Sequence, residues 1–141
     1  MIDFTFQIDV DFQPTIQHKS WLKAVIRNEQ LQPGDIHYLF CDDAYLLERN
    51  IQFLHHDTFT DIITFDNRVG DFVSGEIFIS VERVLENAKL LRVAFSDEML
   101  RVLVHGVLHL CGYKDKTEEE AAQMRSLENK YMVLFHDMFP A

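Results

Sequence analysis

Two histidines, a glycine and an aspartate lie close together in the segment VHGVLHLCGYKD, which spans residues 104–115. His105 and His109 are four residues apart, so a helix would place both imidazoles on one face, one turn apart. Gly112 follows the last helical turn, where a glycine adopts the left-handed conformation that ends a helix and reverses the chain. The reversal would bring Asp115 back over the histidine face. Two imidazoles and a carboxylate can bind one Zn²⁺ and leave a fourth position for water, as in catalytic zinc sites.

A helical pair of histidines also has a plainer interpretation, since imidazoles occur in ordinary protein cores. Gly112 and Asp115, in register with the pair, favour the metal site instead. Zinc peptidases of the HExxH type use a glutamate beside the first histidine as general base, whereas this chain has Gly106 there, which argues against a peptide hydrolase. Zn²⁺ can also polarise a phosphoryl oxygen or lower the pKa of bound water, and either route would cleave a phosphodiester. Asp61 and Glu98 are the candidate general bases, and the sequence does not rank them.

The same segment resembles the signature of the YbeY family, bacterial endoribonucleases of ribosomal RNA maturation, which is usually written HGxLHLxGYDH. The residues that match it in register are His105, Gly106, Leu108, His109, Leu110, Gly112 and Tyr113. Lys114 and Asp115 depart from it, because the family usually has Asp and then His at these positions. An aspartate keeps an oxygen donor for Zn²⁺ but changes the charge and softness of the third ligand, so we expect a less selective metal site.

Two further segments extend the resemblance along the chain. Residues 60–65 (TDIITF) resemble the end of the family's PTDVLSF, and residues 75–80 (GEIFIS) resemble its GDIxIS strand. Three residues before these segments also match the family pattern: Asn50, Phe53 and Asp57.

Two positions before residue 60 differ from the family pattern. Phe59 stands in place of a proline, and Leu54 stands in place of an arginine. Loss of the arginine removes a phosphate contact, which puts the rate rather than the fold in question. His55 and His56 can substitute for it or belong to a solvated turn.

The resemblance implies a single-strand-specific metallo-endoribonuclease that acts in 16S rRNA 3′ end maturation and late ribosome quality control. It implies one Zn²⁺ per chain, held by His105, His109 and Asp115. The expected partners are single-stranded ribosomal RNA and the small ribosomal subunit or its proteins, with no role for DNA or a membrane. Two other hypotheses stay open: a non-catalytic ribosome assembly factor with a structural zinc, and a zinc hydrolase of another substrate. A fourth protein ligand would favour the structural zinc.

Four basic residues are candidate RNA contacts. Lys19, Lys23 and Arg27 follow one face of a predicted helix and form a local positive ridge, or else an ordinary solvated face. Arg101 lies four residues before His105, where it could bind a phosphate or make an ordinary ion pair.

The pattern of apolar residues and turn signals predicts an α+β fold with a mixed four-stranded sheet covered by about five helices, with the metal site on a helix and the turn that follows it. Strands are expected at residues 2–10, at 36–40 after the turn residues Pro33 and Gly34, and at 61–65 and 76–80, the last two as neighbours. Helices are expected at 16–30, from an N-cap at Asp42 or Asp43 to the turn at 55–57, from an N-cap at Ser80 to about 93, from Ser96 to about 111, and from a capping box of Thr117 and Glu120 to about 138. No linker or repeat divides residues 1–141, so we expect a single domain.

The composition limits which binding partners and which cellular compartment we expect. Thirteen Lys and Arg against 23 Asp and Glu give a net charge of −10, which argues against binding nucleic acid through bulk charge, so any RNA contact must be local. Two cysteines, Cys41 and Cys111, are too few for a disulfide framework, and we interpret Cys111 as a packing residue with thiolate ligation as a minor alternative. The N-terminus carries acids where a signal peptide has basic residues, and charges interrupt every long apolar stretch. We therefore expect a soluble cytoplasmic protein.

Overall fold

The structure, a computed structural model, describes residues 1–54 and 60–141. In these residues the strands are β1 (Ile2–Phe6), β2 (Gln32–Cys41), β3 (Ile62–Asp66) and β4 (Phe72–Ser80). The helices are α1 (Ile16–Asn28), α2 (Asp43–Leu54), α3 (Val81–Leu91), α4 (Phe95–Leu110) and α5 (Glu118–Met138). The α+β fold with a mixed four-stranded sheet confirms the prediction from the sequence.

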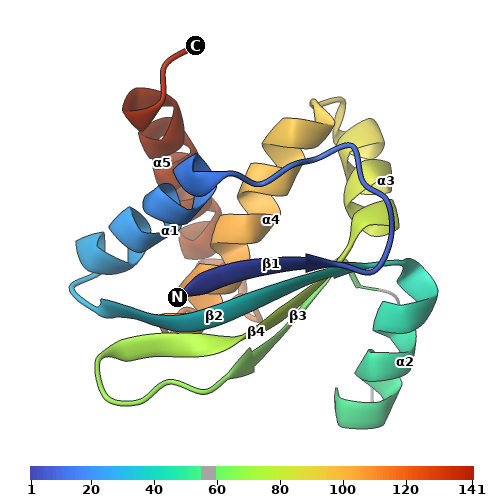
Figure 1. Cartoon of the computed structure of the whole chain (residues 1–141), viewed down its shortest axis with the longest axis horizontal. Coiled ribbons are helices and arrows are strands. Elements are labelled where there is room, and N and C mark those ends of the chain that lie inside the picture. Colours follow the sequence, from blue (N-terminus) through green and yellow to red (C-terminus); the bar gives the residue numbers. More distant parts are fainter. Residues whose placement is uncertain (55–59) are drawn as a thin grey trace.

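The sheet has the strand order β1-β2-β4-β3, so β1 and β3 form its two edges (Figure 1). β1, β2 and β4 run parallel to one another. β3 runs antiparallel to β4, with Ile62 opposite Ile79 and Phe65 opposite Glu76. The two short runs that were predicted to be neighbouring strands are therefore neighbours, and one of them is an edge strand.

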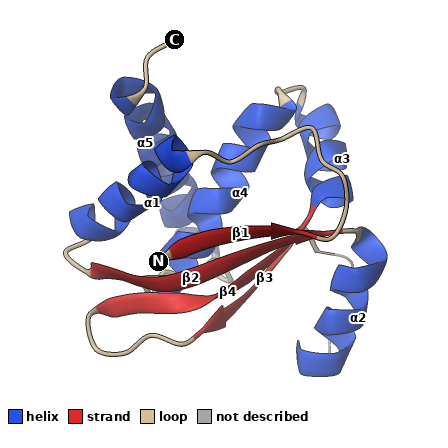
Figure 2. Cartoon of the chain, in the orientation of Figure 1, coloured by secondary structure: helices blue, strands red, loops and turns tan. Residues whose placement is uncertain are grey.

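One face of the sheet is covered by α1, α3, α4 and α5, and α2 lies on the other face (Figure 2). α4 occupies the middle of the helical layer, where it packs against the sheet, α1, α3 and α5. Its close contact with the sheet depends on Gly106, because a Cβ there would lie 3.0 Å from the terminal methyl groups of both Ile62 and Ile77. α4 is consequently fixed directly above β3 and β4. Among the described residues, no helix combines the length and apolar character needed to cross a bilayer.

Side-chain caps begin three of the helices as the sequence predicts. Thr117 Oγ1 accepts from the Glu120 amide at 3.1 Å, and the Glu120 carboxylate accepts from the Thr117 amide at 3.0 Å, which completes a capping box for α5. Ser80 Oγ accepts from the amide of Arg83 at 3.2 Å at the start of α3. Asp42 Oδ1 caps α2 in the same way. α4 begins at Phe95 rather than at Ser96, with no side-chain cap.

β1 is shorter than the predicted strand over residues 2–10. Phe6, its last residue, pairs with Phe40, and β2 ends one residue later. Asp42 then turns the partner chain into α2, so beyond the Gln7 amide, which still donates to the Phe40 carbonyl at 2.9 Å, the chain has no length of β2 left to pair with. Alternating hydrophobicity could not show where the partner strand ends.

β2 and β4 begin four residues earlier than predicted, at Gln32 and Phe72. Pro33 and Gly34, which were expected to precede the strand, lie inside it. A shift in register between Pro33 and Ile36 accommodates them, as a β-bulge does. Pairing with a distant strand overrides the local turn signal.

Candidate metal centre

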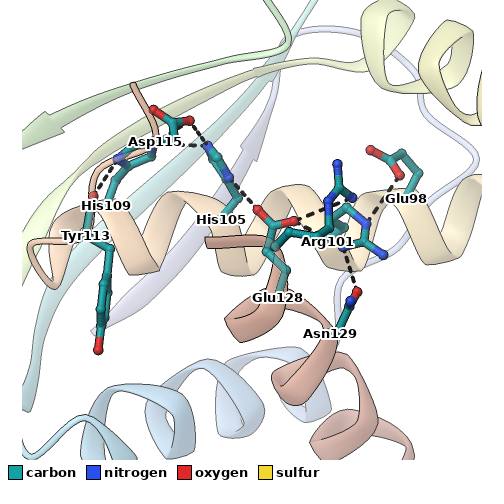
Figure 3. Close-up of polar contacts among 9 residues, drawn as sticks. Glu98, Arg101, His105, His109, Tyr113, Asp115, Glu128 and Asn129 are labelled. Carbon is teal, nitrogen blue, oxygen red and sulfur yellow. Dashed lines mark hydrogen bonds and ion pairs between the residues drawn. The ribbon is translucent and has the colours of Figure 1, made fainter. Parts of the chain in front are cut away.

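His105 and His109 point to the same side of α4, one turn apart (Figure 3). Their Nε2 atoms lie 3.0 Å from each other. The helix is apolar and mostly buried around them, and packing against the sheet fixes its position. Both side chains are partly exposed, so a ligand or ion can reach the paired nitrogens.

The chain reverses after α4 through a Schellman turn. The Gly112 amide donates to the His109 carbonyl at 3.0 Å, and the Tyr113 amide donates to the Leu108 carbonyl at 3.1 Å. Gly112 has φ +111°, a conformation that other residues rarely adopt, which confirms its predicted role. The turn brings Asp115 over the histidines, with its Oδ2 3.3 Å from each Nε2.

The three ligand atoms fit one metal ion. A tetrahedral ion with ligands at about 2.0–2.1 Å holds neighbouring ligand atoms about 3.3 Å apart. The observed separations are 3.0, 3.3 and 3.3 Å. Among the described residues, a set whose ligand atoms could hold one metal ion is formed by His105, His109 and Asp115. We call these three residues the metal group. The sequence thus predicted a group that the fold brings together, while the identity of the metal belongs to the proposal below.

The other ring nitrogen of each histidine has a hydrogen-bond acceptor. His105 Nδ1 lies 2.6 Å from Glu128 Oε2, and His109 Nδ1 lies 2.9 Å from the Tyr113 carbonyl. Both acceptors favour the tautomer that carries its proton on Nδ1. Nε2 of each ring is then free to bind a cation, and its direction is fixed by the hydrogen bond.

Glu128, on α5, is a functional residue that the sequence analysis missed. Its side chain is only 5% exposed, and its Oε1 lies 3.1 Å from Arg101 and 3.7 Å from Arg125. One signal could have revealed it: Glu128 lies on the buried stripe of α5 with Met124 and Tyr131. A carboxylate on an apolar helix face needs a partner, and His105 is that partner.

A second carboxylate holds the turn in place. Tyr113 donates its hydroxyl to Glu29 Oε1 at 2.5 Å, and the Tyr131 hydroxyl donates to Glu29 Oε2. Glu29 follows α1, so these bonds tie the turn after α4 to both α1 and α5. The turn that carries Asp115 is thereby anchored two residues before that aspartate.

The site has a negative electrostatic potential. Burial by itself lowers the pKa of an imidazole, but the hydrogen bond to Glu128 and the charges of Asp115 and Asp61 raise the pKa of His105. Burial raises the pKa of Asp61, and neighbouring carboxylates add to this shift. The potential that favours a proton on His105 also favours a divalent cation there.

Two hollows open beside the metal group, and Asp61 lines both. One, of about 190 Å³, also contains Glu98 and Arg125, and the other, of about 280 Å³, contains Leu54 and Thr64. Glu98 instead pairs with Arg101, and burial raises its pKa although that arginine opposes the shift. Of the two candidate bases, Asp61 therefore lines both hollows, whereas Glu98 lines only the smaller one.

Of the four basic residues predicted to contact RNA, Arg101 lies beside the metal group and the other three do not line its hollows. Arg101 lines the smaller hollow but is paired internally with Glu128, Glu98 and Asn129. Lys19 lies over the Phe4 ring of β1, at the sheet edge opposite β3. The described residues that line the two hollows do not include Lys19, Lys23 or Arg27. The structure does not bring this ridge to the metal group, and RNA contact at all four residues stays a prediction.

Leu54 and Cys111 also flank the site. Leu54, which replaces the arginine of the family pattern, lines the larger hollow with an apolar side chain. Cys111 packs against the main core outside the metal group, and burial raises its pKa to about 12. His55, His56, Asp57 and Phe59 lie outside the described residues.

Comparison with known proteins agrees with this geometry. The family model "Endoribonuclease YbeY" matches residues 5–136. The chain belongs to the YbeY family. YbeY proteins from Flavobacterium psychrophilum and Flavobacterium johnsoniae, both named Endoribonuclease YbeY, are each 48% identical to it over 136 residues, which is 96% of this chain and 97% or 98% of theirs. The chain also resembles the solution structure of TM1509 from Thermotoga maritima, with a TM-score of 0.68 and 25% identity, over 99% of this chain and 91% of that one. The resemblance deduced from the motifs is confirmed.

Proposed function

We propose that this protein is a single-strand-specific, zinc-dependent endoribonuclease that acts in 16S rRNA 3′ end maturation and late ribosome quality control. One observation carries the proposal: three ligand atoms converge within 3.0–3.3 Å beside hollows that Asp61 lines. Its YbeY relatives are named endoribonucleases, which supports RNA as the substrate. We assign residues 1–141 to one metallohydrolase domain with one Zn²⁺.

His105, His109 and Asp115 would hold the zinc, and Glu128 and the Tyr113 carbonyl orient the two imidazoles. When bound, zinc would polarise a phosphoryl oxygen of the substrate or lower the pKa of a bound water molecule. Asp61 is the group that we assign to proton transfer, because it lines both hollows and no hydrogen bond to another described side chain occupies its carboxylate.

The alternative of a structural zinc is less well supported. Structural zinc sites are usually closed by a fourth protein ligand. In the part of the chain that the structure describes, the metal group has three members, and Glu128 is directed to His105 Nδ1 rather than to the shared Nε2 side. These three residues would therefore leave a bound zinc open to water or substrate, as in catalytic zinc sites.

A peptide substrate is disfavoured by packing. Gly106 occupies the position where HExxH peptidases have their glutamate. Even a Cβ at Gly106 would lie 3.0 Å from the terminal methyl groups of Ile62 and Ile77, so a glutamate there would have to displace these side chains. A phosphodiester remains the best-supported substrate. The small ribosomal subunit as partner and the cytoplasm as compartment follow from the proposed role.

The test is metal content and RNA cleavage on one preparation, wild type beside His109→Ala. Stoichiometric zinc and cutting of a single-stranded ribosomal RNA precursor are expected from the wild type. The variant, with one imidazole removed, should lose both. Zinc without cleavage in a folded preparation would contradict the nuclease and favour an assembly factor, whereas a variant that keeps its zinc would show that the metal site is wrong.

A further inference from the structure

An aromatic hollow is lined by residues of α2, β3, β4 and the turn after β3. α2 lies on the face of the sheet away from α4, the helix that carries His105 and His109 (Figure 1). It has a volume of about 360 Å³, and its lining residues are Tyr45, Arg49, Phe53, Phe65, Asn67, Glu76 and Phe78. Phe53 and Phe65 meet edge to face with ring centroids 5.7 Å apart, and Phe65 and Phe78 do so at 5.5 Å. Phe53 is 51% exposed, an unusual state for a large apolar side chain in a cluster.

The aromatic hollow and the metal group lie on the two sides of one edge strand. Phe65 lines the aromatic hollow, and Thr64, the preceding residue, lines the 280 Å³ hollow that contains His105, His109 and Asp115. In the same way, Phe53 lines the aromatic hollow and the next residue, Leu54, lines the 280 Å³ hollow. Two pairs of consecutive residues therefore connect the hollows around β3, and in the described part of the chain no strand pairs with the outer side of β3. A flexible chain at the metal group needs only to pass this edge to reach the aromatic rings.

The lining suits a nucleobase. Aromatic rings stack on unpaired bases of single-stranded nucleic acid, and they do so with little regard to sequence. Arg49 lies over the Tyr45 and Phe53 rings, at 4.7 and 5.8 Å from their centroids, where its guanidinium plane can extend a stack. Asn67 and Glu76 add polar groups that can pair with a base edge, and the Glu76 carboxylate would repel a phosphate. The hollow thus suits a base rather than the RNA backbone.

We propose that this aromatic hollow binds an unpaired base of the single-stranded RNA whose backbone passes the metal group. The inference rests on the proposed nuclease function and adds to it a base-binding subsite on the opposite side of β3. It makes Phe53 a residue that contacts substrate at a distance from the reacting phosphodiester.

The test compares Phe53→Ala with Phe72→Ala, a matched control, because Phe72 is 55% exposed but lies outside the hollow. Binding of a fluorescent single-stranded ribosomal RNA fragment is measured by anisotropy, with both substitutions placed in the His109→Ala protein so that the RNA is not cut. Loss of one stacked base should weaken binding by about 5- to 150-fold in the Phe53 variant. The Phe72 variant should bind within about twofold of its parent.

A set of RNAs, each with one abasic position, then identifies the base. One position should reproduce the loss caused by Phe53→Ala, with no further loss when the two changes are combined. Equal binding by the Phe53 and Phe72 variants overturns the inference, and cleavage by wild type still supports the nuclease. The inference also fails if Phe53→Ala weakens binding of a ribosomal protein while RNA binding is unchanged. If the wild type neither binds nor cuts RNA, the proposed function itself fails.

Discussion

Replacing Glu128 with glutamine should weaken metal binding although Glu128 is not a ligand. The carboxylate uses both oxygens: Oε2 lies 2.6 Å from His105 Nδ1, and Oε1 lies 3.1 Å from Arg101 Nη1. Glutamine keeps the volume but has one oxygen, so its amide nitrogen must face either the imidazole or the guanidinium, both of which are donors. One of the two contacts is therefore lost, and His105 loses its negatively charged partner in either arrangement.

Changing such an outer contact typically reduces metal affinity about 10- to 100-fold, which corresponds to about 1.4–2.8 kcal/mol of binding free energy. Competition with a chromophoric zinc chelator at pH 7.5 would measure the dissociation constant for wild type and Glu128→Gln. Glu119→Gln is the matched control, because Glu119 lies on the same helix with an exposed side chain. Thermal melting of the metal-free proteins separates an unfolded variant from a folded one. Affinity within twofold of wild type in a folded Glu128 variant would refute the reasoning.

Three further substitutions test the site. Asp115→Asn removes the negative charge of the third ligand, so zinc affinity should fall by more than the roughly 10- to 100-fold expected for an outer contact. The same chelator competition measures it, and unchanged affinity would exclude Asp115 as a ligand. Asp61→Asn should lower kcat at least about 100-fold with zinc content unchanged, and a kcat within tenfold of wild type would remove Asp61 from proton transfer. Burial raises the pKa of Glu98 in the folded protein. At pH above that pKa the buried, ionised carboxylate lowers the free energy of unfolding, and this penalty disappears as the pH falls and the carboxylate is protonated. Glu98→Gln should therefore raise the free energy of unfolding at pH 7 by about 1 kcal/mol, and denaturant titrations should show this gain shrinking toward pH 4.5; a less stable variant at pH 7 would contradict the argument.

The local signals in the sequence predicted much of the fold. Helix caps at Ser80 and Thr117 depend on contacts within three residues, and the structure confirms them. Strand ends were predicted less well, because they depend on the partner strand. β1 stops where β2 turns into α2, and β2 continues through Pro33 because β4 is there to pair with it.

The basic residues predicted to contact RNA also show what depends on the spacing along the chain and what depends on the tertiary structure. Sequence spacing suggested a basic ridge at Lys19, Lys23 and Arg27, but the sheet order places its first member at the edge opposite β3. Arg101 does lie beside the metal group, as its spacing from His105 indicates, yet its partner is a carboxylate on α5. Spacing along one helix determines which face a residue occupies and leaves open what covers that face.

The sequence by itself determined the metal group of this protein. His105 and His109 are one helical turn apart, and Gly112 permits the turn that returns Asp115 to them, so the whole group lies within 11 consecutive residues. Only the tertiary structure decided what surrounds it. Glu128 comes from α5 and Asp61 from the segment before β3, and the aromatic hollow is formed where α2 meets β3 and β4. Contacts between distant elements depend on how the whole core packs, which the spacing of residues in a single segment does not encode.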